Sequence, residues 1–152
     1  MVRTLVAPVS FVAVVLMGLI AGLLVGTAME QHTLRSLSGS AWITARHSID
    51  ALFSRVMPWV WNLTLVVLFL AAAANGGRAR WLFLTSGLIL LLAIVVTVAV
   101  EVPMNKQIAA WDAGAVPANW AAIRDRWLQF HTLRTVAGGV AFACAVLAGR
   151  VR

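Results

Sequence analysis

Three long stretches of this chain carry no charged side chain. They cover residues 5–29, 56–74 and 81–100. A helix needs about 20 mostly apolar residues to cross the hydrocarbon core of a bilayer, because each residue adds about 1.5 Å. The three stretches therefore predict three membrane-spanning helices.

A fourth apolar stretch, residues 135–149, is short for a span. It becomes long enough if its helix starts near Trp127, which gives a span over 127–149 with His131 and Arg134 inside it. The first stretch follows Arg3 as a signal peptide would, but its apolar length exceeds the roughly 7–15 residues of a signal-peptide core. We therefore expect it to be retained, which makes four spans.

The composition favours the same fold class. Of 152 residues, 62% are hydrophobic and only 11% are charged, with a mean hydropathy of +0.93, whereas soluble domains have about 25% charged residues. We expect an all-α integral membrane protein, an antiparallel four-helix bundle that forms a single domain over residues 1–152. The lipid bilayer is thus a predicted partner. The lone Cys144 allows no intrachain disulfide.

The net charge of +7 does not indicate nucleic-acid binding. The basic residues are scattered near the ends of the apolar stretches rather than gathered on one face. Five of them, and no acidic residue, fall on one side of the predicted membrane: Arg3, Arg78, Arg80, Arg150 and Arg152. Because cytoplasmic loops are rich in Lys and Arg, we expect a cell (inner) membrane protein with both termini in the cytoplasm.

The opposite, outer side receives residues 30–55 and 101–126, which we expect to include amphipathic helices lying over the mouth of the bundle. Pro103 and Pro117 predict breaks there. On the inner side, the short connection at 75–80 makes the second and third spans neighbours.

Glycines predict close helix contacts. Gly18, Gly22 and Gly26 repeat every four residues, which lets another helix approach closely; this surface equally suits a homo-oligomer. Gly138 and Gly139 offer a similar surface on the last span. Glu30 continues the first series near the predicted contact face.

All five carboxylates and all three histidines lie in the outer segments or at their borders. Glu101 directly follows twenty uncharged residues, so it lies near the membrane surface, where a carboxylate needs a partner. His131 and Arg134 lie inside the last span, where Glu101 and Glu30 are the expected partners of Arg134. A buried ion pair of this kind also has a purely structural use.

His131 has three open roles: acid–base or substrate contact, ligation of a haem or metal, and structural hydrogen bonding. Arg134 one turn away favours its neutral, basic form. His47 and Asp50 share a helix face, a pattern also typical of a solvated helix. Common metal-binding spacings are absent from the sequence, so no cofactor is predicted. A metal, if bound, would use His131, Glu101, His47 and Glu30.

Six of the seven tryptophans lie toward the outer side. Membrane anchoring alone places aromatic rings at both interfaces. The asymmetry therefore suggests that some of these rings line a pocket for a hydrophobic small molecule, with Trp127, Trp120, Trp59 and Glu30 as candidate contacts.

The segment Glu101-Val102-Pro103-Met104-Asn105, followed by Trp127, His131 and Arg134 in a W-x3-H-x2-R element, resembles the anthrone-oxygenase-like family of small four-helix membrane proteins. The resemblance extends over most of the chain. It implies that Asn105, Trp127, His131 and Arg134 occupy the family's recurring positions, and that the chain is an oxidoreductase for an aromatic or quinone-like compound. Some members oxidise anthrones with dioxygen.

This chemistry would use His131 or Glu101 as a base and Arg134 or Asn105 to stabilise an enolate oxygen. The alternative is a non-catalytic bundle, either an accessory subunit or a binder of lipid or another hydrophobic ligand.

Overall fold

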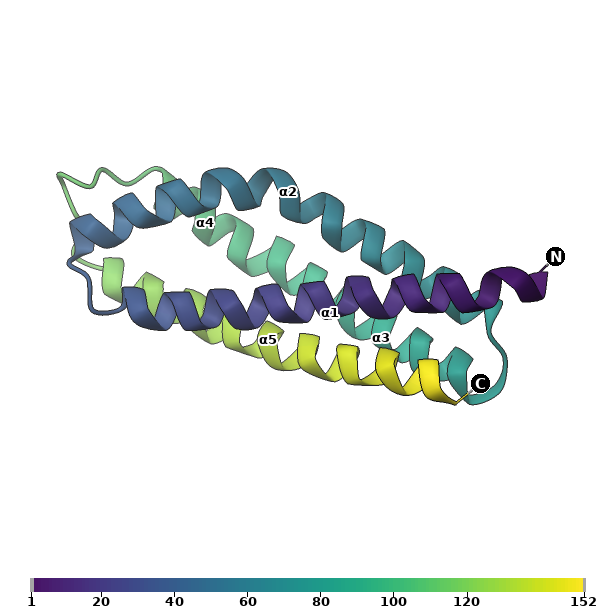
Figure 1. The fold of residues 1–152 in the computed structure, drawn as a ribbon. Helices are drawn as coiled ribbons and strands as arrows, with labels where there is room; N and C mark the ends of the chain where they lie inside the picture. The colour runs from purple at the N-terminus through teal and green to yellow at the C-terminus, as the bar shows by residue number, and fades with distance from the viewer. Residues whose placement is uncertain (1, 152) are drawn as a thin grey trace.

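A computed structural model describes residues 2–151 of the chain as a bundle of long helices (Figure 1). Its elements are α1 (Val2–Leu34), α2 (Gly39–Ala74), α3 (Gly77–Val96), the π-helical turn η1 (Thr97–Glu101), α4 (Val102–Ala109) and α5 (Trp120–Arg150). Consecutive long helices run in opposite directions, and the two chain ends lie at the same end of the bundle (Figure 1). The predicted all-α four-helix fold is confirmed.

Four helices among the described residues are long and apolar enough to cross a membrane, with η1 and α4 prolonging α3. Large apolar side chains cover the outside of the bundle, including Phe11, Leu19, Leu92 and Val136. A soluble protein rarely exposes so much apolar surface. These features fit a multi-pass membrane protein whose outer surface contacts lipid.

Short connections hold the helices together. The connection between α2 and α3 uses Asn75, whose side-chain amide donates to Ser10 Oγ and to the Ala71 carbonyl, both at 2.9 Å. Gly77 follows with φ +54°, a conformation that favours glycine. At the other end, which we call the head, the Ser38 side chain caps α2 by accepting from the Ala41 amide.

The amphipathic helix expected within residues 30–55 is not separate from the second span. Instead α2 runs without interruption from Gly39 to Ala74, with Pro58 inside it. A proline can be accommodated within a membrane helix when neighbouring groups satisfy the freed backbone. The outer part of 30–55 is therefore an extension of α1 and α2 along the bundle.

The expected break at Pro103 is also absent. The helix widens into η1 and continues as α4, with Pro103 in the first turn of α4. The π-helical turn directly before Pro103 accommodates the missing proline N–H without a break in the helix. The predicted break at Pro117 is confirmed, since it lies in the loop before α5. That helix begins at Trp120 rather than near Trp127.

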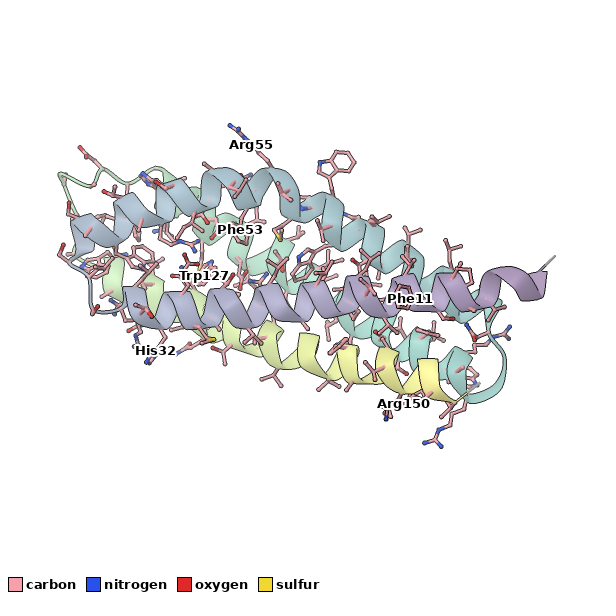
Figure 2. The ribbon with its side chains drawn as sticks, viewed as in Figure 1. Phe11, His32, Phe53, Arg55, Trp127 and Arg150 are labelled. Carbon is pink, nitrogen blue, oxygen red and sulfur yellow. The ribbon has the colours of Figure 1, made fainter. Side chains whose placement is uncertain are left out.

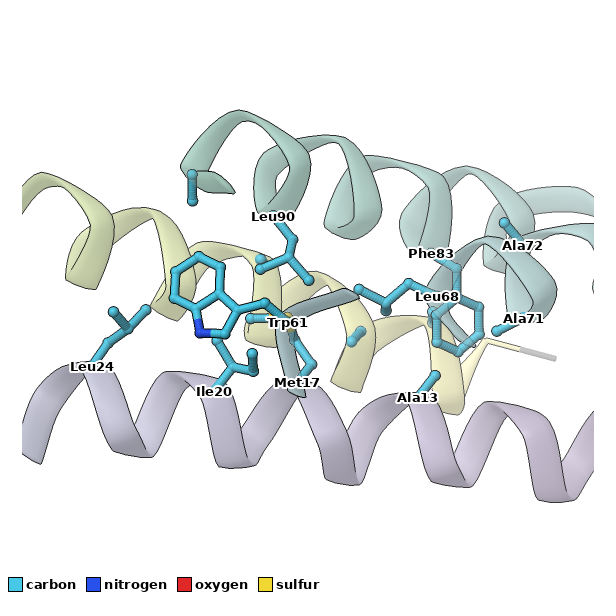
Figure 3. Close-up of a cluster of buried hydrophobic side chains, with 14 residues drawn as sticks. Ala13, Met17, Ile20, Leu24, Trp61, Leu68, Ala71, Ala72, Phe83 and Leu90 are labelled. Atoms are coloured by element: carbon cyan, nitrogen blue, oxygen red, sulfur yellow. The ribbon is translucent and has the colours of Figure 1, made fainter. Parts of the chain in front are cut away.

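Two apolar clusters fill the interior. The larger one joins all four long helices and includes Met17, Trp61, Phe83 and Leu90 (Figure 3). A smaller one, around Trp42, Ile43 and Ile108, lies in the head. Between these two clusters, the long helices carry the buried residues Arg46, Glu101, His131 and Arg134.

The glycine series of α1 does not pack as expected. Gly18 contacts Phe142, but a Cβ at Gly22 or Gly26 would meet no described atom within 4 Å. Both line an open groove of about 550 Å³ together with Glu30 and Phe53. The core is filled instead by Met17, Ile20 and Leu24 from another face of α1.

Gly138 does make a close helix contact, which gives a testable prediction. A Cβ there would lie 2.6 Å from Leu24 Cδ1, whereas at Gly139 it would meet no described atom within 4 Å. We expect Gly138→Leu to lower the free energy of unfolding by about 1–3 kcal/mol through overpacking. Gly139→Leu is the matched control, measured by thermal unfolding in detergent. Equal losses in both variants would contradict the packing.

Candidate functional site

Glu101 and Arg134 form an ion pair inside the bundle. The Arg134 Nη2 contacts Glu101 Oε2, and the two residues are only 1% and 7% exposed. Glu101 ends the π-helical turn η1, and such turns often occur at functional sites. The pair predicted from the sequence is therefore present, with Glu101 rather than Glu30 as the partner.

The guanidinium of Arg134 organises the surrounding side chains. Its Nη1 donates to Thr97 Oγ1 at 2.7 Å, and its Nη2 donates to His131 Nδ1 at 2.8 Å. Thr97 in turn donates to the Ala93 carbonyl at 2.7 Å. The guanidinium is thus fixed from three directions by η1 and α5.

These contacts determine the tautomer of His131. Arginine can only donate hydrogen bonds, so His131 Nδ1 must accept. The other nitrogen, Nε2, lies 3.0 Å from the Leu24 carbonyl oxygen and must donate to it. Both ring nitrogens are engaged in this arrangement, and Nε2 carries the hydrogen. His131 therefore has no free lone pair with which to act as a base.

Trp127 links this group to the head. Its ring stacks on His131 with centroids 4.9 Å apart and planes 6° from parallel. Its Nε1 donates to Asn105 Oδ1 at 2.8 Å. In Figure 2 Trp127 points into the bundle interior between the helices. A continuous series of side-chain contacts thus links Asn105, Trp127, His131 and Arg134.

Arg46 completes the cluster, and the sequence analysis missed it. It is 2% exposed. Its Nη2 donates to Asp50 at 2.9 Å and to Asn105 Oδ1 at 3.2 Å, and its Cζ lies 4.3 Å from the Trp127 ring centroid. The i, i+4 spacing of Arg46 and Asp50 was the available sequence indication. Asp50 is therefore a half-buried partner of the buried Arg46 rather than a fully solvated residue.

We call Arg46, Glu101, Asn105, Trp127, His131 and Arg134 the polar cluster. All six lie within residues 46–144, the region matched by the family model for anthrone oxygenase. The match covers well over half of the chain. The chain belongs to the anthrone oxygenase family. No curated protein and no solved structure matches it.

The other site residues predicted from the sequence lie outside the polar cluster. Trp59 is 79% exposed on the outside of α2, and Glu30 is exposed in the groove along α1. Trp120 packs against Trp42 in the head, with ring centroids 5.9 Å apart. Of the four candidate contacts for a hydrophobic molecule, Trp127 alone is in the cluster.

The residues considered for a metal are not assembled. Within residues 2–151 no group of three His, Cys, Asp or Glu side chains is placed to hold a metal ion. His47 instead lies with its Nε2 3.0 Å from the Ile108 carbonyl oxygen, which connects α2 to α4.

Five buried side-chain atoms of the described residues have no hydrogen-bond partner. One is an acceptor, Glu101 Oε1; the others are donors, namely Gln31 Nε2, Trp42 Nε1, Arg46 Nε and Arg134 Nε. Buried polar groups in proteins nearly always have partners. An ordered water or a bound molecule would supply the missing partners of these atoms.

Proposed function

We propose that this chain is a membrane-embedded oxidoreductase that uses dioxygen to oxidise a flat, apolar aromatic or quinone-like molecule at the polar cluster. The observation that carries the proposal is Glu101 Oε1, a buried carboxylate oxygen without a partner among the described residues. It lies in a cluster that also contains aromatic and cationic groups. Family membership supports the same reaction class.

An anthrone illustrates the chemistry. Its methylene group is a weak carbon acid, because the electron pair left by deprotonation is delocalised onto the carbonyl oxygen as an enolate. In the proposed reaction, Glu101 Oε1 takes the methylene proton. The neighbouring buried donors, above all Arg134, stabilise the negative oxygen.

The oxidation then balances with dioxygen alone. The enolate carbon forms a bond to one oxygen atom, and the O–O bond breaks. The methylene becomes a carbonyl, and the second oxygen atom leaves as water with the two hydrogens of the methylene. This is a four-electron oxidation of the substrate and a four-electron reduction of dioxygen, so no other reductant is needed.

The remaining residues position these groups. Trp127 is enclosed by His131, which stacks on its ring, and by the Arg46 guanidinium, which lies 4.3 Å from its centroid, so it holds both side chains in place. His131, with both nitrogens bonded, holds Arg134 and supports Trp127 by stacking. Asn105 accepts from both Trp127 and Arg46. We assign these three residues to orientation rather than to proton transfer.

The proposal includes a location. Among the described side chains, the end of the bundle with the α2–α3 connection carries Arg78, Arg80 and Arg150 and no acidic residue. All five carboxylates lie in the head or between the head and the larger apolar cluster. This distribution supports a cell-membrane protein with both termini in the cytoplasm. The proposal also keeps residues 1–152 as a single domain. The polar cluster would then lie toward the outer leaflet, where an apolar substrate dissolves.

A second candidate function is a non-catalytic bundle that binds a hydrophobic ligand or a partner subunit. The observation that favours it is the ion pair of Glu101 and Arg134, because buried pairs of this kind also serve structure alone.

An oxidation assay distinguishes the two functions. Protein reconstituted in lipid nanodiscs is mixed with anthrone in air-saturated buffer, and oxygen uptake and anthraquinone formation are followed against empty nanodiscs. If the protein is an oxidoreductase, we expect anthraquinone to form well above the spontaneous rate, with one oxygen molecule consumed per molecule of product. A rate equal to that of empty nanodiscs, for anthrone and for its dihydroxy derivatives, would favour the non-catalytic bundle. An absorption spectrum of the same sample detects any copurified haem.

A further inference from the structure

The seam between α1 and α2 opens in the middle of the bundle. A helix packed against a core buries a residue at every third or fourth position, and α2 does so up to Arg46 and again from Trp61 onward. None of residues 47–60 is buried, although this stretch extends for about 20 Å. On α1, residues 25–30 are likewise not buried. In Figure 1 the middle of α2 arches away from α1.

An apolar groove of about 550 Å³ occupies this opening. Its lining includes Gly22, Leu23 and Gly26 of α1 and Phe53 of α2. Phe53 lies two helical turns after Arg46, so the two residues share a face of α2. In Figure 2 Phe53 lies between α2 and α1. The groove is therefore bounded by the inward face of α2 and not only by the outside of the bundle.

Both walls of the groove adjoin the polar cluster. On α2, Arg46 at one end of the unburied stretch belongs to the cluster, and the ring centroid of Trp61 at the other end lies 5.6 Å from Arg134 Cζ. On α1, the Leu24 carbonyl, between groove-lining residues, accepts from His131 Nε2 at 3.0 Å. The opening thus lies at the level of the polar cluster along the bundle.

Close contacts join the helices at the other seams. At Gly138 of α5, an added Cβ would lie 2.6 Å from a side chain of α1. Ser86 of α3 donates to the Ala141 carbonyl of α5 at 2.8 Å. Arg46 of α2 donates to Asn105 of α4 at 3.2 Å, and the smaller apolar cluster fills the head. A molecule that reaches the enclosed cluster from lipid therefore has its most direct route between α1 and α2.

We propose that the groove between α1 and α2 is a lateral entrance, through which a flat, neutral aromatic molecule passes from the lipid to Glu101. The inference rests on the proposed function and supplies the route that its enclosed site needs. Such a molecule dissolves in hydrocarbon, and the groove offers it an apolar wall. Phe53 presents an aromatic ring to it. The groove is the passage, and the polar cluster is where the molecule comes to rest.

Filling the groove tests the entrance. Gly22→Phe and Gly26→Phe each place a ring in the open space, and a Cβ at either position meets no described atom within 4 Å, so the fold should be retained. Binding of anthraquinone in nanodiscs is followed by stopped-flow quenching of tryptophan fluorescence. The association and dissociation rate constants should both fall at least about tenfold, because binding then requires the helices to separate. The dissociation constant should change little, since the resting site is intact.

Gly139→Phe is the matched control. A Cβ at Gly139 also meets no described atom within 4 Å, but the residue lies on α5 and does not line the groove. This variant should keep the wild-type rate constants. Phe53→Ala removes a ring from the groove wall and should raise both rate constants. Circular dichroism and gel filtration establish that each variant is folded.

Rate constants that stay at the wild-type values in folded Gly22→Phe and Gly26→Phe would overturn the entrance. So would a dissociation constant that rises while the dissociation rate constant does not fall, because the groove would then be a resting site. Wild type that binds no anthraquinone would also refute the entrance. In each case the anthrone assay decides the proposed function separately, since it measures turnover and not the route of entry.

Discussion

Glu101→Gln is expected to reduce oxidation of anthrone by about 100-fold or more, because general base catalysis contributes about 10²–10⁴-fold to enzymatic rates. The amide cannot accept a proton at neutral pH, and the other candidate base, His131, already uses both ring nitrogens. The measurement is the initial rate of oxygen uptake per folded protein in nanodiscs, after subtraction of the rate in empty nanodiscs.

Two further variants separate catalysis from folding. Glu101→Asp keeps the negative charge beside Arg134 but moves the carboxylate back by one methylene, so it should fold well and still be slow. Asp125→Asn removes a carboxylate from a surface pair with Arg35 and Arg124 and should retain the wild-type rate. Full activity in folded Glu101→Gln would refute the assignment of the base.

Arg134→Met is expected to lower the free energy of unfolding by about 3–5 kcal/mol, the typical loss when one partner of a buried ion pair is removed. The variant leaves Glu101 charged and almost fully buried, and it also removes the donor to Thr97 and His131. Reversible unfolding in mixed detergent micelles measures the change.

The double variant Glu101→Leu with Arg134→Met should regain most of this stability, because two apolar side chains replace the pair. It should have no oxidase activity. A loss in the double variant equal to the sum of the two single losses would show that the residues are not energetically coupled, contrary to the buried pair.

Much of the fold could be predicted because charge is so strongly excluded from the hydrocarbon region. The uncharged stretches predicted the spans, and the short segment 75–80 between two of them predicted the connection between α2 and α3. The sequence could not show that α2 continues through Pro58 or that the helix continues past Pro103. In both places tertiary packing and a local π-helical turn override the usual effect of proline.

The candidate site was predicted in part for a similar reason. Glu101, His131 and Arg134 are conspicuous because they are polar groups at the border of long apolar stretches. Arg46 was missed since it lies in a segment rich in polar residues, where a buried cation and a solvated one look alike. Within the bundle only Gly18 of the α1 series contacts another helix, because helical spacing identifies a face of small residues but does not indicate what the face contacts.

The most direct test of the central claim is an experimental structure of the protein with anthraquinone bound. We predict that the ligand lies in the polar cluster, with Glu101 Oε1 facing the ring system and a ligand oxygen within hydrogen-bonding distance of Arg134 Nε. Ligand density confined to the groove beside Gly22 and Gly26, with the polar cluster unchanged, would contradict the account.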